Sequence, residues 1–370
     1  MIANGRMAWV LRRAAGAAKP ALVAIGLAAS LAMTSGAGAQ DCSERDWKAC
    51  KGKPWVVGDR MDTPIGEAWW PNKLWGKDDE AGSTNWYTRP EVIQRALAEA
   101  RTGKVYRLAR PYTSDMPTFG ERKFVLRIPG GPTGGPFGAN VLVYNDEFVA
   151  TEIGQIGTQF DGLGHIGVAV NGAADKSQMR FYNGITQLEM EGSTGLKRLG
   201  VEKLHPIVAR GILIDVAGAK GVDSLEAGYE ITVADVYAAL EKQGMKDFRF
   251  LPGDGVFFRT GWGKYWIKDN ARYNAGQPGI GMEVAKWLSD VVQVGVTGAD
   301  NWGTEVIPNK EPGCAFCVHS HLITRHGIVN QENMHLDDIA KDRVFRFLYV
   351  FSPTPIVGAT GSPGAPLAIR

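Results

Sequence analysis

The chain contains little histidine, little cysteine and no large excess of either charge. Its 370 residues include six histidines and four cysteines, and the formal net charge is +2. So small a charge, without a long basic run, does not favour binding to nucleic acid or to an anionic membrane surface. The sequence also lacks a glycine-rich phosphate loop and a helix-turn-helix pattern. We therefore expect no nucleic-acid partner.

Long apolar runs are also missing. The one short run, residues 21–33, follows a basic start that includes Arg12, and residues 37–39 then offer a small-x-small cleavage site. A transmembrane helix needs ~20 apolar residues, so this run is short for the alternative of an uncleaved anchor. The pattern predicts a secretory signal peptide over residues 1–39. We expect a periplasmic or secreted protein that has no membrane contact after cleavage.

Export determines how the four cysteines are interpreted. An even number of cysteines in an oxidising compartment favours disulfides. The simplest pairing joins Cys42 with Cys50 and Cys314 with Cys317, although four cysteines allow three pairings. The spacing of Cys314 and Cys317 also occurs in redox dithiols and in zinc sites, but the chain has no second pair of this kind. We therefore expect structural disulfides.

The composition is that of a soluble globular protein with a sizeable core, since 44% of the residues are hydrophobic and 22% are charged. Residues 40–90 are irregular but carry six tryptophans, which indicates an ordered segment that wraps the core. Beyond them, runs rich in β-branched and aromatic residues alternate with helical patterns, which predicts one α/β domain over residues 91–370. Residues 282–291 are one expected helix, and residues 292–296 are one of the expected strands.

The most informative segment is residues 155–165. Its polar side chains Gln155, Gln159, Asp161 and His165 are separated by even numbers of residues, so in an extended chain they would share one face. Carboxylate oxygens and imidazole nitrogens are common ligands of divalent metals, and amide oxygens are weak ones. A metal held by such residues could acidify a water molecule for hydrolysis.

This segment resembles the signature of the cyclase family of metal-dependent hydrolases, which reads His-x-Gly-Thr-His-x-Asp-x-x-x-His. Four residues match the signature: Gly157, Thr158, Asp161 and His165. Gln155 and Gln159 stand at the positions of two signature histidines. Four later segments are similar to elements that follow in the family, in the same order: residues 210–216, 253–262, 319–333 and 352–355.

The resemblance implies a fold and a state of assembly. The expected fold is α/β of the swivelling β/α/β type, with a mixed sheet or barrel-like core and surrounding helices. Residues 91–370 would form the catalytic domain of such a protein. The resemblance also implies a homo-oligomer, either a dimer or a tetramer.

A metal site is implied as well. The family pattern assigns Asp161, His319 and Glu332 as ligands of a divalent ion, zinc or manganese. His321 lies close enough to the expected position to be an alternative to His319. Without the resemblance, a single glutamate such as Glu332 is more often a solvated loop residue.

Three further side chains have a role in this interpretation. His165 would transfer protons beside the metal. Gln155 and Gln159 would either bind the metal weakly or hold a substrate carbonyl through their amide hydrogens. If they are structural instead, their amides bond neighbouring backbone.

The implied reaction is hydrolysis of a C–N bond by metal-activated water. An aryl formamide, an amide or a lactam would be the substrate, and N-formyl-kynurenine is an example, which would place the activity in tryptophan catabolism to kynurenine. Phe160, Trp302 and Phe316 lie near the motif residues in sequence and are expected to wall an aromatic pocket. The alternative is a periplasmic small-molecule binding protein whose metal site is lost or altered.

Overall fold

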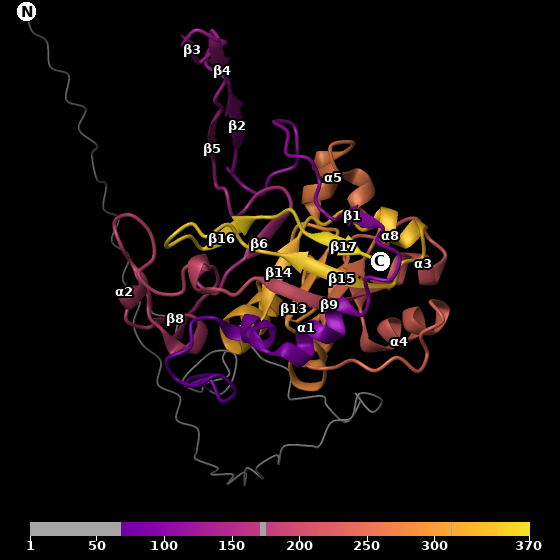
Figure 1. The fold of residues 1–370 in the computed structure, drawn as a ribbon. Helices are drawn as coiled ribbons and strands as arrows, with labels where there is room; N and C mark the ends of the chain where they lie inside the picture. The colour runs from indigo at the N-terminus through magenta and orange to yellow at the C-terminus, as the bar shows by residue number, and fades with distance from the viewer. Residues whose placement is uncertain (1–67, 171–174, 312) are drawn as a thin grey trace, which may run out of the picture. The chain divides into compact units, whose positions relative to one another are not determined.

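A computed structural model describes residues 68–170, 175–311 and 313–370. A nine-stranded mixed sheet lies at the centre of these residues (Figure 1). Its order is β1 (Val105–Arg107), β17 (Leu367–Ile369), β15 (Arg346–Phe351), β9 (Ile207–Asp215), β11 (Gly255–Arg259), β13 (Val296–Ala299), β14 (Val329–Glu332), β6 (Gln159–Asp161) and β16 (Gly361–Pro363). The four central strands β9, β11, β13 and β14 are parallel, and the outer pairs are antiparallel. The expected α/β class with a mixed sheet is confirmed.

The two faces of the sheet bury two separate hydrophobic cores. On β9, Leu213 belongs to one core, whereas Ile212 and Ile214 belong to the other. This split follows from the two-residue period of a strand, and it explains why β9 carries apolar residues on both faces over most of its length. Helices α1 (Pro90–Leu97) and α8 (Asp337–Lys341) contribute to the first core, and α4 (Val233–Lys242) and α6 (Met282–Lys286) contribute to the second.

Short elements complete the described fold. The remaining α-helices are α2 (Gln187–Met190), α3 (Val216–Lys220), α5 (Asn270–Ala275) and α7 (Cys317–His319). The 3-10 helices are η2 (Gly82–Thr88), η4 (Tyr182–Gly184), η5 (Val201–Lys203) and η6 (Trp262–Tyr265), and the π-helices are η7 (Trp287–Val292) and η8 (Ser320–Arg325). Two small sheets pair β7 (Val168–Ala169) with β8 (Met179–Arg180), and β10 (Glu230–Ile231) with β12 (Gly279–Ile280).

The region around residue 292 differs from the sequence-based expectation. The expected helix 282–291 is present as α6, which continues directly into η7 and ends at Val292. The expected strand 292–296 is wrong, because Gln293 adopts a left-handed conformation with φ of 53° and turns the chain. Strand β13 therefore begins only at Val296.

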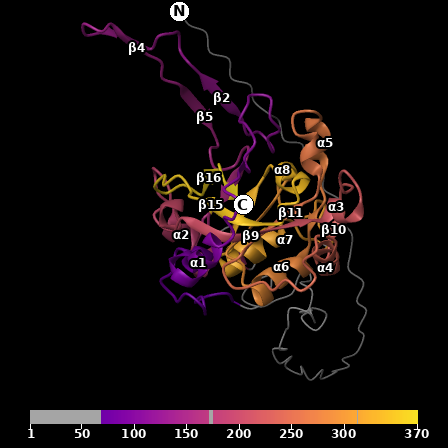
Figure 2. The ribbon, with the colours of Figure 1, turned by 45° about the vertical axis from the view of Figure 1, so that its right-hand side comes forward.

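An antiparallel ribbon leaves the sheet and exposes apolar side chains. Strands β2 (Phe124–Arg127) and β5 (Phe148–Thr151) pair with each other, and β3 (Gly134–Phe137) and β4 (Leu142–Tyr144) pair at its tip. Figures 1 and 2 show this ribbon standing clear of the nine-stranded sheet. Its exposed large apolar residues are Val125, Leu126, Ile128, Phe137, Val141, Leu142, Val143, Tyr144, Phe148 and Val149.

Two of the later family-like segments are joined by ion pairs between neighbouring strands, one buried and one partly buried. The guanidinium of Arg210 on β9 donates to both carboxylate oxygens of Asp254, at 3.0 Å and 2.5 Å. At the other end of the same strand pair, Arg259 on β11 donates to Asp215 at 2.9 Å. These charged motif residues therefore fix the β9–β11 pair.

Several expectations fall on residues that the structure does not describe. The signal peptide over residues 1–39, most of the tryptophan-rich segment and the pair Cys42 and Cys50 lie outside the described residues. From residue 68 onward the tryptophan-rich segment packs on the body, with Trp69 and Trp86 both buried. Within residues 68–170, 175–311 and 313–370, no helix is long and apolar enough to cross a bilayer.

Candidate metal centre

Two neighbouring antiparallel strands place four polar side chains on one face. In the register of β6 and β14, Asp161 lies opposite Asn330, and Gln159 lies opposite Glu332. Residues two apart on a strand point to the same side, so all four side chains meet. All four are buried. Buried polar groups in such a position need partners, and here they become partners of one another.

His319 completes this group from helix α7. Its Nε2 lies 3.0 Å from Oε1 of Glu332 and 3.7 Å from Oδ2 of Asp161. Asp161, His319 and Glu332 each offer one ligand atom, and these atoms lie within 4.8 Å of one another. Cys314 and Cys317 form a disulfide in the loop that leads into α7. This bond ties down the chain two residues before His319.

The choice between His319 and His321 is decided by the helix. Side chains two residues apart on a helix point in nearly opposite directions. His319 therefore points at Asp161 and Glu332, whereas Nε2 of His321 lies 2.9 Å from Oγ of Ser289 on a different helical segment. Only His319 reaches the cluster.

The two glutamines contact the carboxylates directly. Nε2 of Gln159 donates to Oε2 of Glu332 at 2.7 Å, and Nε2 of Gln155 donates to Oδ1 of Asp161 at 3.2 Å. The chain is extended only over β6, so Gln155 reaches the site from a turn and not along a continuous strand. His165 also follows a turn, and its Nε2 lies 3.9 Å from Oδ1 of Asp161. The expected group is assembled, although the expected extended path is wrong.

Two residues that sequence reasoning missed hold the cluster in place. Glu305 is fully buried and accepts from Nδ1 of His319 at 2.5 Å and from its backbone N–H at 3.1 Å. Nδ2 of Asn330 donates to Glu332 at 3.0 Å and to Asp161 at 3.2 Å. The two-residue spacing of Asn330 and Glu332 is a signal that could have found Asn330. Glu305 lies in a loop and gives no local signal.

The protonation of the cluster reflects its burial and its charges. Burial and the neighbouring charge of Asp161 raise the pKa of Glu332 to about 8. Burial works against ionisation of His319, yet its hydrogen bonds to Glu305 and Glu332 raise its pKa well above the usual value. Burial lowers the pKa of His165, which keeps this imidazole neutral at pH 7.

These properties fit a divalent cation. Three carboxylates, those of Asp161, Glu305 and Glu332, are buried around the single imidazole of His319. Buried like charges at this range repel one another, and a dication would relieve that repulsion. Two carboxylate oxygens and one imidazole nitrogen are ordinary ligands of zinc and manganese. Glu305 would act as the outer partner that orients a ligating histidine through its other nitrogen.

The three aromatic residues expected around the site are not all there. Phe160 is fully buried and packs on Phe351 at 5.0 Å between ring centroids. It lies between Gln159 and Asp161 on β6, so its side chain points to the opposite face and into the core, and the structure does not bring it to the site. Trp302 and Phe316 lie together at 6.2 Å, and Phe316 packs edge-on against His319 at 5.4 Å.

Phe119 is a third aromatic residue at this position, and sequence reasoning missed it. Its ring stacks on Trp302 at 4.6 Å and meets Phe316 edge-on at 6.4 Å. Phe119 is 42% exposed. Phe119, Trp302 and Phe316, here called the aromatic group, therefore form a partly open apolar surface next to His319.

Comparison with known proteins adds the following. A family model described as "Putative cyclase" matches residues 106–306. A crystal structure described as that of a novel cyclase is 32% identical in sequence; the match covers 80% of this chain and 96% of that chain, with a TM-score of 0.67. No curated protein matches this chain.

Isatin hydrolases have a similar fold. Isatin hydrolase A from Ralstonia solanacearum is 21% identical, covering 76% of this chain and 98% of its own, with a TM-score of 0.52. Isatin hydrolase A from Labrenzia aggregata, bound to benzyl benzoate, is 18% identical, covering 75% and 98%, with a TM-score of 0.50. At these identities the likeness shows a shared fold.

Proposed function

Because the chain belongs to the cyclase family, we propose that it is a metal-dependent hydrolase that cleaves a C–N bond. The proposed substrate is an aryl formamide, an amide or a lactam, with N-formyl-kynurenine as the test compound. The observation that carries the proposal is the buried cluster of Asp161, His319 and Glu332, with His165 beside it. Fold alone would not be enough, because one fold supports many functions.

In this proposal Asp161, His319 and Glu332 hold a divalent ion, zinc or manganese. Such an ion supplies a Lewis acid that polarises a carbonyl oxygen and acidifies water. Glu305 keeps Nε2 of His319 directed at the site, because its carboxylate accepts the hydrogen on Nδ1. Asn330 fixes the two ligating carboxylates relative to each other through its amide group.

His165 is the group that moves protons. It is neutral at pH 7, its side chain is 20% exposed, and it lies against Asp161. A neutral imidazole can accept a proton from water and return it to the departing nitrogen. The charge of Asp161 stabilises the imidazolium that forms between these two transfers.

The aromatic group supports an aryl substrate. Phe119, Trp302 and Phe316 present an apolar surface beside His319, and a planar ring could stack there. The side-chain amides of Gln155 and Gln159 have hydrogens that can bind a carbonyl oxygen of the substrate.

The test uses purified full-length protein. Its metal content is measured, and hydrolysis of N-formyl-kynurenine and of isatin is followed before and after treatment with a chelator. We expect turnover that the chelator abolishes and that zinc or manganese restores. Asp161→Ala should remove metal and turnover together while the circular dichroism spectrum stays unchanged, because a methyl group cannot replace a ligating carboxylate. Full metal content in this variant would refute the site assignment.

One observation favours a second candidate function. The amide of Gln159 donates to Glu332 at 2.7 Å, so the cluster can satisfy its carboxylates without a metal. A protein of this kind would capture a small aromatic ligand without cleaving it. Metal-free protein that binds the ligand in calorimetry and shows no turnover would support this alternative over the hydrolase.

We also propose export to the periplasm or beyond, and a homo-oligomer. The signal pattern over residues 1–39 supports export. The exposed apolar side chains of the β2–β5 ribbon support self-association, because a second copy would cover them. Light scattering of the purified protein would give its mass, and Leu126→Asp in that ribbon should lower the mass to that of one chain. A wild-type mass equal to one chain would contradict the oligomer.

A further inference from the structure

A second group of metal-binding side chains lies outside the site described above. Asp290, His321 and His326 each offer one ligand atom, and these atoms lie within 4.8 Å of one another. Two imidazoles and one carboxylate form a donor set that holds zinc and other first-row divalent ions with positions left open. The primary site and the hydrolytic proposal use none of these three residues.

The backbone that carries the three residues is unusual. Asp290 lies in the π-helix η7, and His321 lies in the π-helix η8, whose C-cap is His326. Single π-helical turns are rare and occur frequently at functional sites. His321 lies near the start of η8 and His326 directly after its end, and the wide turn brings their ring centroids to 4.4 Å from each other. An α-helix would turn them away from each other.

Ser289 holds two members of the group in place. Its hydroxyl donates to Oδ1 of Asp290 at 2.7 Å and lies 2.9 Å from Nε2 of His321. Outer partners of this kind orient metal ligands.

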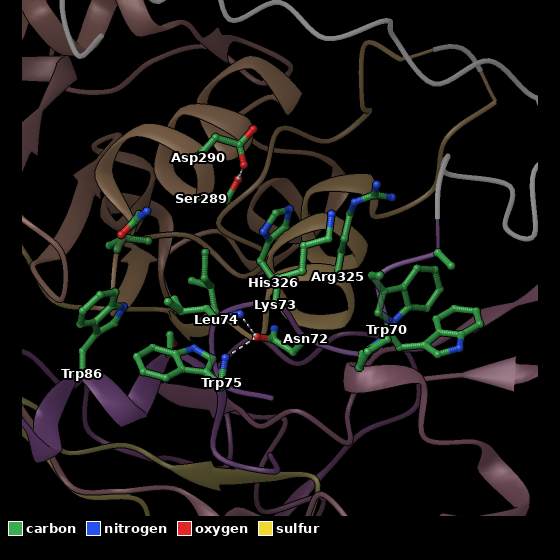
Figure 3. Close-up of a pocket in the computed structure, with 17 residues that line it drawn as sticks. Trp70, Asn72, Lys73, Leu74, Trp75, Trp86, Ser289, Asp290, Arg325 and His326 are labelled. Carbon is green, nitrogen blue, oxygen red and sulfur yellow. Dashed lines mark hydrogen bonds between the residues drawn. The ribbon is translucent and has the colours of Figure 1, made fainter. Parts of the chain in front are cut away.

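The group borders a cavity of about 510 Å³. Asp290 and His326 are in its wall, and His321 is buried behind them. Figure 3 shows Ser289 and Asp290 on one helix and His326 at the end of another, with Trp75 and Trp86 across the cavity. An ion between Asp290 and His326 would therefore face this space.

We propose that Asp290, His321 and His326 form a second site for a first-row divalent cation such as Zn²⁺, with a coordination position open to the tryptophan-lined cavity. The geometry of three convergent ligand atoms, two π-helical turns and an adjoining cavity carries this assignment. It stands independently of the hydrolytic function proposed above.

The test is a titration of metal-free full-length protein with Zn²⁺ in a calorimeter, repeated with Co²⁺ and read by visible absorption. Wild type should bind one ion more than His326→Ala and one ion more than Asp290→Asn. Asp290 is exposed, so its variant should fold normally. His335→Ala is the matched control, because His335 also lies 3.2 Å from a carboxylate, that of Asp338, but on the surface. This control should bind as wild type does.

The outcomes separate the two sites. Asp161→Ala should lose the primary ion and keep the second, and the double variant with Asp290→Asn should lose both. Equal binding by wild type, His326→Ala and Asp290→Asn would overturn the second site and leave the hydrolase proposal intact. An ion that Asp161→Ala retains and Asp290→Asn loses would support the second site even if no hydrolysis is found.

Discussion

Glu305 offers a sharp test of how the primary site works. Its links to the site are two hydrogen bonds that it accepts from His319, one from Nδ1 at 2.5 Å and one from the backbone N–H at 3.1 Å. Glu305→Gln removes the negative charge and keeps the size of the side chain. The amide oxygen can still accept from Nδ1, but a neutral acceptor makes His319 a weaker donor to a metal.

Glu305→Gln is expected to affect both metal affinity and stability. Loss of an outer partner of a ligating histidine weakens metal binding roughly 10- to 100-fold, about 1.4 to 2.8 kcal/mol. A second cost falls on folding. Oε2 of Glu305 accepts from Nδ2 of Asn309 at 2.9 Å, and an NH2 group at this point would face another donor. Two buried donors that face each other leave one of them without an acceptor, which lowers the free energy of unfolding by about 1 to 3 kcal/mol.

The two effects are measured separately. Zn²⁺ affinity comes from calorimetry well below the melting temperature, and the free energy of unfolding of metal-free protein comes from urea titration. Glu226→Gln is the control, because the Glu226 side chain is 86% exposed and its contact with Arg272 is long, at 3.8 Å. If Glu305→Gln bound Zn²⁺ as tightly as Glu226→Gln does, the orienting role of Glu305 would be refuted, and with it the assignment of His319 as a ligand.

Three further predictions follow from the structure and the sequence. Gln159→His should strengthen binding of zinc or manganese in a calorimetric titration, because imidazole nitrogen is a better donor than an amide oxygen; unchanged affinity, also with Gln155→His, would show that these side chains are structural. Asp254→Ala should lower the free energy of unfolding in urea by about 3 to 5 kcal/mol, since it leaves Arg210 buried without its partner, whereas the exposed Glu241→Gln should change nothing measurable. Mass spectrometry of protein from an exporting host should find a mature chain that starts near Gln40 and has no free thiol; an intact Met1 would count against export.

Some of the site could be predicted because one simple period governs it. The two-residue repeat of a strand puts Gln159 and Asp161 on the same face, and the register of β6 with β14 then adds Asn330 and Glu332. The same repeat puts Phe160 on the opposite face. The burial of Phe160 in the core could therefore have been predicted from the sequence. The expectation that Phe160 lines a pocket contradicted the two-residue repeat that placed Gln159 and Asp161 in the site.

Other parts of the site depend on contacts that no local pattern contains. His319 and His321 could not be separated without knowing that their segment is helical. The expected helix over residues 282–291 gave no sign that its end would be π-helical. Glu305 and His319 are 14 positions apart in the sequence, and a buried carboxylate looks like any exposed one in the sequence.

The two glutamines change which metal ion the site prefers without changing the net charge of the site. A neutral histidine and a glutamine both add no charge, so the cluster keeps the excess of carboxylates that attracts a dication. The donor atoms differ, however, because two imidazole nitrogens are replaced by amide oxygens, leaving His319 as the imidazole among the proposed ligands. Oxygen-rich sites suit manganese better than zinc, whereas added imidazoles raise the affinity for zinc. The amide groups of Gln155 and Gln159 donate to Asp161 and Glu332. A metal that binds their oxygens requires these amide groups to rotate first. The cost of that rotation lowers the affinity for every ion bound through them.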